Sequence, residues 1–159
     1  MKTLLSLSLI SYLFLGYPGH LKGQIPTNQQ KSKIEIQVDS VFQTMVKAAE
    51  TMDYDKLNLG VDDRHKASFI VNNSYYNEYD TMIGILKANV DSGTTQNISI
   101  QNQKITVLSN TIVLITASGV AQVELATGQS FNINFLWSFV YEKINNEWKV
   151  IQSHQSQAN

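Results

Sequence analysis

The residue best suited to chemistry in this sequence is His154, which lies in the segment W-K-V-I-Q-S-H-Q-S near the C-terminal end. Asn145-Asn146 predicts a two-residue turn, because Asn tolerates the positive φ angles that such a turn needs. The turn pairs two strands as a β-hairpin and places His154 opposite Trp137. A His on the wall of an apolar cavity can act as a general acid, a general base or a hydrogen-bond donor. It can equally be a buried structural residue, so both interpretations stay open.

The first strand of this hairpin alternates large apolar residues with smaller or polar ones, which is typical of a strand buried on one face. Directly opposed residues point to the same side of a sheet, so polar residues of the last strand join the aromatic row. Polar groups on a core face cost free energy unless they are paired or used, and this favours a ligand cavity. The predicted ligand-binding residues on this wall are Trp137, Phe139, Gln152, His154 and Ser156.

A second turn at Thr127-Gly128 extends the same wall to Glu124. If the loop has two residues, Glu124 lies beside Phe131 on the inner side, near the rim of the cavity. Glu124 therefore completes the predicted set of ligand-binding residues. A carboxylate at a rim is either a candidate for chemistry or a merely solvated side chain.

The composition excludes several classes of protein. With 159 residues, 43% hydrophobic and 16% charged, the chain suits one globular domain. Its formal charge is −1 and Arg64 is the single arginine, so no nucleic-acid partner is expected. The chain has no cysteine, so it can have neither disulfides nor a lipid-modified cysteine. The histidines have no metal-ligand spacing, so neither a metal nor a cofactor is predicted.

The N-terminus has the pattern of a secretory signal peptide: a short basic start and an apolar run, residues 4–15, that is too short to cross a bilayer core. Cleavage is predicted after Gly23, with Gly16 and Gly19 as alternatives, so residues 1–23 would be removed. The other interpretation is a retained N-terminal anchor helix. We expect a secreted or periplasmic protein without a stable membrane anchor.

The remaining chain divides into a linker and one domain. Residues 24–33 are polar, contain proline and lack periodicity, which predicts a disordered linker. Residues 34–157 form the domain, of α+β class: a cone-shaped, curved antiparallel sheet packed on three N-terminal helices. Helices are expected at 34–52, 54–59 and 81–92, a short hairpin at 67–77, and long strands at 96–108, 111–125, 131–144 and 148–156.

This order of elements, the turn N-N-E-W and the ending W-K-V-I-Q-S-H-Q-S resemble the SnoaL-like family of the nuclear transport factor 2-like superfamily. The ending also resembles the association domain of calmodulin-dependent kinase II. The resemblance spans roughly residues 34–156 and implies a fold that hosts isomerases, cyclases, dehydratases, transport factors and oligomerisation modules. Ketosteroid isomerases of the superfamily use an Asp base with a Tyr and a protonated Asp, a set that cannot be placed here.

The predicted function is the binding of a small, largely apolar molecule in the cone cavity of an exported domain, with no reaction assigned. One alternative is a non-catalytic dimerisation or adaptor module. Another is an isomerase- or cyclase-type enzyme that uses the same cavity. The outer side of the hairpin carries Leu136, Val140 and Ile151 among polar residues, which predicts a homodimer.

Overall fold

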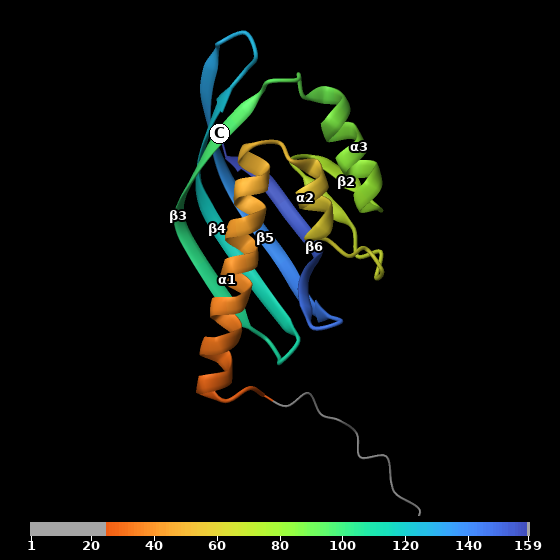
Figure 1. Cartoon of the computed structure of the whole chain (residues 1–159), viewed down its shortest axis with the longest axis vertical. Coiled ribbons are helices and arrows are strands. Elements are labelled where there is room, and N and C mark those ends of the chain that lie inside the picture. Colours follow the sequence, from red (N-terminus) through yellow and green to blue (C-terminus); the bar gives the residue numbers. More distant parts are fainter. Residues whose placement is uncertain (1–24, 159) are drawn as a thin grey trace, which may run out of the picture.

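The computed structural model describes residues 25–158, in which three helices pack against one face of a six-stranded sheet (Figure 1). The predicted signal peptide, residues 1–23, lies outside the described residues. Within the described part, no helix is both long and apolar enough to cross a membrane. The elements are α1 (Asn28–Glu50), α2 (Tyr54–Leu59), β1 (Phe69–Val71), β2 (Ser74–Tyr76), α3 (Tyr79–Asn89), β3 (Thr95–Val107), β4 (Ile112–Glu124), β5 (Ser130–Ile144) and β6 (Glu147–Ala158).

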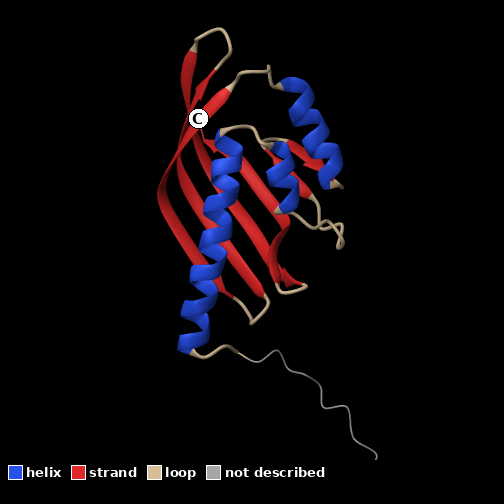
Figure 2. Ribbon diagram, viewed as in Figure 1, coloured by secondary structure: helices blue, strands red, loops and turns tan. Residues whose placement is uncertain are grey.

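The sheet has the strand order β2-β1-β6-β5-β4-β3. Figure 2 shows the long strands side by side, with the helices gathered on one side of them. The α+β prediction with a curved sheet is therefore confirmed. The sheet is mixed rather than wholly antiparallel, because β1 pairs in parallel with β6.

Helix α1 begins at Asn28 rather than at residue 34, so residues 28–33, predicted as part of the disordered linker over residues 24–33, are helical. Thr27 and Gln30 form a capping box, in which the Thr27 amide donates to Gln30 Oε1 at 2.8 Å and the Gln30 amide donates to Thr27 Oγ1 at 3.3 Å. Such a box satisfies backbone donors that a helix start otherwise leaves unpaired. The first turns are largely exposed, so they lack the apolar stripe on which the prediction relied.

The core lies between α1 and the inner face of the sheet. Val38 and Phe42 of α1 have 0% and 1% of their surface exposed, and the Phe42 ring contacts that of Phe139 with centroids 5.8 Å apart. Complete burial of such a side chain contributes about 1.5–3 kcal/mol. This packing sets the distance between α1 and the sheet.

Two β-bulges interrupt the long ladders. One lies between Ile100 and Asn102 in β3, and the other places Ile151 of β6 outside the pairing with β5. Bulges bend a strand and increase its twist, which suits a sheet that curves around a cavity. The β3 bulge lies opposite Gly119, where an added Cβ would be 2.0 Å from the Ser99 carbonyl oxygen. Only glycine fits this close approach of two strands.

Candidate functional site

A cavity of about 460 Å³ lies between the helices and the concave face of the sheet. Helices α1 and α3 contribute an apolar side, and β4, β5 and β6 contribute the wall opposite them. Most of the lining side chains are aliphatic, aromatic or methionine. The lining includes Phe42, Met45, Val46, Phe69, Tyr79, Met82, Ile83, Ala121, Val123, Ile133, Phe135, Trp137, Phe139, Tyr141, Val150, Ser153 and Gln155.

The aromatic row of β5 forms the centre of this wall, as predicted. Trp137 and Phe139 both line the cavity. Trp137 stacks on Phe135 with ring centroids 3.8 Å apart and contacts Phe139 edge-on at 6.0 Å. Contacts of this kind stabilise the rings beyond their burial and so fix the shape of the wall.

The prediction that His154 and Gln152 line the cavity is wrong. From Ile144 to Tyr141 the pairing follows the predicted two-residue turn, but beyond the Ile151 bulge His154 pairs with Ser138 instead of Trp137. A shift of one residue moves every later side chain to the other face. His154 is exposed on the outer face, and Gln152, opposite Val140, is on that face as well.

Ser156 is turned outward by the same shift. It pairs with Leu136, donates its hydroxyl proton to the Leu136 carbonyl oxygen at 3.2 Å, and contacts both the cavity and a shallow depression on the outer face. Its predicted place beside Phe135 on the inner wall is therefore wrong. A ligand in the cavity would meet only the edge of this residue.

Glu124 also points away from the cavity. It pairs with Ser130, and its neighbour Val123 takes the inward position opposite Phe131. The turn holds three residues rather than two, because the Leu125 amide bonds to the Gln129 carbonyl oxygen and Gly128 adopts φ 84°. A glycine in the left-handed region is typical of three-residue hairpin loops.

The side chains that the β6 bulge turns inward are Ser153, Gln155 and Gln157. Ser153 has 2% of its surface exposed and lies opposite Phe139, and its Oγ accepts a hydrogen bond from Gln155 Nε2 at 3.3 Å. In the register predicted from the two-residue turn at Asn145-Asn146, Ser153 and Gln155 lie on the outer face, so they were not predicted as site residues. The wall beside the aromatic row is therefore polar, but with a hydroxyl and amides in place of an imidazole.

Tyr79, the first residue of α3, is a further buried residue of the lining that carries a hydroxyl group, as do Thr94 and Tyr141. It is 7% exposed, and its ring contacts Phe69 edge-on with centroids 5.2 Å apart. Asp63 fixes this end of α3, because its Oδ2 accepts a hydrogen bond from the Tyr79 amide at 2.9 Å while the side chain of the capping residue Glu78 makes no capping hydrogen bond. The loop before β1 thus positions Tyr79.

The titratable groups of the lining are mainly phenols. Burial raises the pKa of Tyr141 and the pKa of Tyr79 above the ordinary tyrosine value, so both side chains stay protonated at neutral pH. The only carboxylate among the described lining residues is that of Asp91, which is exposed in the loop before β3. In residues 25–158 no three His, Asp or Glu side chains cluster as metal ligands would. The lining thus offers hydrogen-bond donors rather than a general base.

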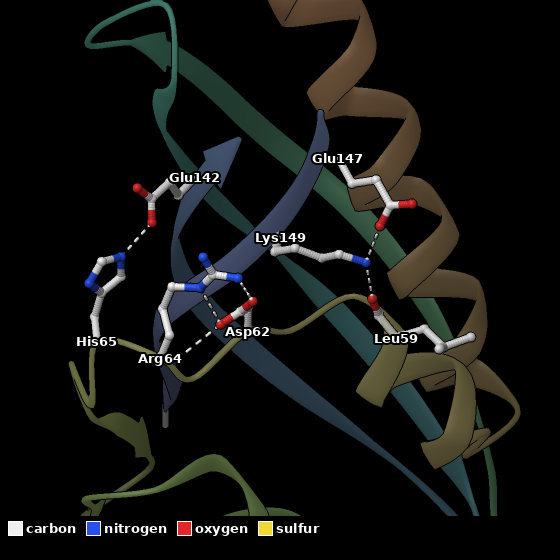
Figure 3. Close-up of polar contacts among 7 residues, drawn as sticks. All are labelled: Leu59, Asp62, Arg64, His65, Glu142, Glu147 and Lys149. Carbon is white, nitrogen blue, oxygen red and sulfur yellow. Dashed lines mark hydrogen bonds and ion pairs between the residues drawn. The ribbon is translucent and has the colours of Figure 1, made fainter. Parts of the chain in front are cut away.

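Charged side chains instead gather along the edge of β6, outside the cavity (Figure 3). His65 Nε2 lies 2.5 Å from Glu142 Oε2, and Lys149 Nζ lies 2.7 Å from both Glu147 Oε2 and the Leu59 carbonyl oxygen. The His65–Glu142 and Lys149–Leu59 contacts hold the segment between α2 and β1 along this edge. Exposed ion pairs of this kind stabilise a fold by about 0–1 kcal/mol each.

Arg64 and Asp62 form the remaining pair of this group. Arg64 contacts both carboxylate oxygens of Asp62, at 2.9 and 2.7 Å (Figure 3). Hydrogen bonds from the Arg64 side chain lower the pKa of Asp62. The Asp62 amide in turn donates to the Val150 carbonyl oxygen at 2.9 Å, so the pair also anchors its segment to β6.

A signal for the inward side of β4 was present in the sequence. Ala121 and Val123 alternate with polar Gln122 and Glu124, so matching apolar residues across the turn would have placed Val123 opposite Phe131. No comparable signal exists in β6. There, residues 152–157 are polar at every position, and either register gives a polar inner wall.

Solved structures of the nuclear transport factor 2-like fold are similar to this chain over most of its length. A protein of unknown function of this class from Shewanella oneidensis has a TM-score of 0.61 at 18% identity, covering 77% of this chain and 98% of its own. A putative scytalone dehydratase from Novosphingobium aromaticivorans has a TM-score of 0.71 at 11% identity, with coverages of 84% and 89%. The association domain of CaMKII from C. elegans has a TM-score of 0.64 at 13% identity, with coverages of 82% and 99%.

These likenesses show that the chain has the nuclear transport factor 2-like α+β cone fold. The model of the SnoaL-like domain matches residues 38–159, and the chain belongs to this family. No curated protein matches the sequence. The fold is therefore related to those of dehydratases and isomerases, and a fold alone does not determine the chemistry that a chain carries out.

Proposed function

We propose that this protein binds a small, largely apolar molecule in the cavity between its helices and the concave face of its sheet. The observation that carries the proposal is the cavity itself, of about 460 Å³ and lined mainly by apolar side chains with a few polar ones. Binding sites for small molecules span about 300–1,000 Å³ and combine these two features. A core that served packing alone would be filled to crystal-like density.

The proposal is limited to binding. The phenols of Tyr79 and Tyr141 are protonated at neutral pH, and the carboxylate of Asp91 is exposed at the edge of the lining. Such a lining supports recognition by hydrogen bonds more directly than it supports proton transfer. The dehydratase similarity concerns the fold.

Binding can be tested with N-phenyl-1-naphthylamine, an uncharged dye whose fluorescence rises in apolar surroundings. We expect saturable binding that is abolished or weakened at least tenfold by Ala121→Phe, because Ala121 lines the cavity and the added ring would occupy it. The matched control is Val120→Phe, since Val120 is the next residue of β4 and faces outward opposite Asn134.

Circular dichroism and melting temperature establish that each variant is folded before its affinity is compared. Equal dye binding by the Ala121 variant and the wild type would locate the dye outside the cavity. The same conclusion would follow if the two phenylalanine variants lost binding equally. Absence of any saturable binding by the wild-type protein would contradict the proposed function.

A second candidate function is assembly through the outer face of the sheet. Leu136 is 54% exposed in the middle of this face, opposite Ser118 and Ser156, and it lines the shallow depression there. An exposed leucine on a broad sheet face suits a self-complementary contact about a two-fold axis. The CaMKII association domain has the same fold.

Light scattering at micromolar concentration tests the assembly. We expect about twice the monomer mass, and we expect Leu136→Lys to give monomers that still bind the dye. Tyr75→Lys is the control, because Tyr75 is 65% exposed but lies on the short strand β2. A wild-type monomer would contradict the assembly and leave the cavity proposal intact.

Export of the protein is the third part of the proposal, supported by the N-terminal pattern of a basic start, an apolar run and Gly23 before Gln24. We expect the mature protein to begin near Gln24 and to be secreted or periplasmic. N-terminal sequencing of the protein from its native host would test this. Recovery of an intact Met1 would contradict it.

A further inference from the structure

We infer that the ligand of the cavity is uncharged and carries an oxygen atom that accepts hydrogen bonds from the hydroxyl groups of Ser153 and Tyr79. The inference rests on the proposed binding function and specifies the chemical class of the ligand. It assigns two residues that sequence reasoning did not select. Ketones, esters, ethers and alcohols with an apolar body belong to this class.

The charge of the lining excludes anions. Among the described residues that line the cavity there is no Lys, Arg or His, and the only charged side chain is that of Asp91. A carboxylate or phosphate inside would lose its hydration without gaining a counter-charge, which is strongly unfavourable. Asp91 does not favour a buried cation either, because it is exposed and its charge is screened by water.

Ser153 supplies the first donor. It is 2% exposed, so its hydroxyl is shielded from bulk water, and the β6 bulge turns it inward opposite Phe139. The oxygen accepts from Gln155 Nε2 at 3.3 Å, but its own proton has no acceptor among the described residues. A hydroxyl keeps one donor and two acceptor positions, so this proton remains for a molecule in the cavity.

Tyr79 supplies the second donor. Its ring is buried against Phe69, and its hydroxyl makes no hydrogen bond to any described residue, although the side chain lines the cavity. Buried phenols usually find a partner for their hydroxyl group. Since the protein provides none, the proton of the Tyr79 hydroxyl is available to a molecule that occupies the cavity.

The two hydroxyl-bearing residues adjoin the same residue. Phe69 is the register partner of Ser153 in the β1–β6 pairing, and its ring contacts that of Tyr79 at 5.2 Å. Phe69 is 0% exposed, so this corner of the cavity is rigidly packed. Both hydroxyl-bearing residues thus lie at this corner of the cavity, where the inference places the acceptor oxygen of the ligand, while the aromatic row of β5 accommodates its apolar remainder.

Three naphthalenes that share one framework test the inference by displacing N-phenyl-1-naphthylamine. 2-Acetylnaphthalene is neutral and has an acceptor oxygen, 2-ethylnaphthalene is neutral without one, and 2-naphthoate is an anion. We expect 2-naphthoate to bind the wild-type protein at least about tenfold more weakly than 2-acetylnaphthalene, because the carboxylate would be desolvated.

Ser153→Ala and Tyr79→Phe remove only the hydroxyl groups. Each should weaken 2-acetylnaphthalene binding about three- to tenfold, the effect of one net hydrogen bond, and leave 2-ethylnaphthalene binding within about twofold of the wild type. The matched controls are Ser138→Ala, on the outer face opposite His154, and Tyr75→Phe, at an exposed tyrosine. Neither control should change any of the affinities.

The outcomes separate this inference from the proposed function. If the dye and 2-ethylnaphthalene bind, but both hydroxyl variants bind 2-acetylnaphthalene as the wild type does, the donor pair is wrong and the cavity function stands. Binding of 2-naphthoate as tight as that of 2-acetylnaphthalene would overturn the claim of an uncharged ligand. If the dye does not bind at all, both the inference and the proposed function fail.

Discussion

Replacing Gly119 with alanine should destabilise the protein strongly, because the strand has no room for a methyl group there. The added Cβ would lie 2.0 Å from the Ser99 carbonyl oxygen, 3.0 Å from the Ser99 carbonyl carbon and 2.7 Å from Phe135 Cζ. Two of these atoms belong to the backbone of β3, which cannot rotate away as a side chain can. The two strands would have to separate next to the β3 bulge.

The magnitude follows from two opposing terms. Overpacking of this kind costs about 1–3 kcal/mol and occasionally more, and the backbone contact puts Gly119→Ala at the upper end. Alanine gains about 0.4–1 kcal/mol over glycine, because the unfolded chain loses conformational freedom. We therefore expect a net loss of about 2–3 kcal/mol in unfolding free energy, or roughly 10 °C in melting temperature.

Urea unfolding followed by circular dichroism measures this loss, and Gly84→Ala is the matched control. Gly84 lies within α3, and apart from its chain neighbours and the backbone of its own helix no atom lies within 4 Å of the position of an added Cβ. There the same substitution should stabilise the protein by about 0.5–1 kcal/mol, since glycine is unfavourable in a helix interior. A Gly119 variant as stable as the wild type would refute the close-packed geometry at the bulge.

Three further predictions concern single side chains. Trp148 is 6% exposed, and its indole Nε1 donates a hydrogen bond to Gln37 Oε1. Trp148→Ala should therefore lower the free energy of unfolding in urea by about 3–5 kcal/mol, and a loss below about 1 kcal/mol would contradict its burial. His154→Gln should change stability by less than about 0.5 kcal/mol and leave dye binding unchanged, because His154 is exposed outside the cavity; weaker dye binding would argue against this placement. Burial raises the pKa of Tyr141 in the folded state above that in the unfolded state. The protonated phenol therefore contributes fully to the free energy of unfolding below about pH 10, and this contribution is lost as the pH rises further. The urea midpoint should therefore decrease between pH 8 and pH 10.5, and it should decrease less for Tyr141→Phe than for the wild type. Equal decreases would contradict the burial of Tyr141.

Much of the fold could be predicted from the sequence because its local patterns agree with its global plan. The stripe of Val38, Phe42 and Val46 has helical spacing, and the aromatic row of β5 alternates with period two. The turn at Asn145-Asn146 could also be predicted, and both residues adopt positive φ angles. The parallel pairing of β1 with β6 could not be predicted, since it joins segments that are distant in sequence.

The site was harder to predict because a bulge leaves no mark in a strand that is polar on both faces. Register is strongly specified only where a shift would expose apolar residues, and beyond Ile151 a shift merely exchanges one polar set for another. His154, Gln152 and Ser156 were therefore as acceptable on the inner wall as Ser153 and Gln155. The hydrophobic pattern of β6 therefore does not distinguish the two registers.

Contacts with the other edge of β6 make that choice instead. The Gly60–Asp62 segment pairs with Val150 before the bulge, while β1 pairs in parallel with residues 153–155 beyond it. The extra residue, Ile151, lies between these two pairings and lets β6 satisfy both segments as well as β5. Phe69 of β1 fits against Ser153 only in the shifted register, and the hydroxyl that faces the cavity is thus selected by a strand far away in the sequence. Tertiary contacts therefore determine which side chains of β6 line the cavity, and the sequence of the β5–β6 hairpin alone cannot predict them.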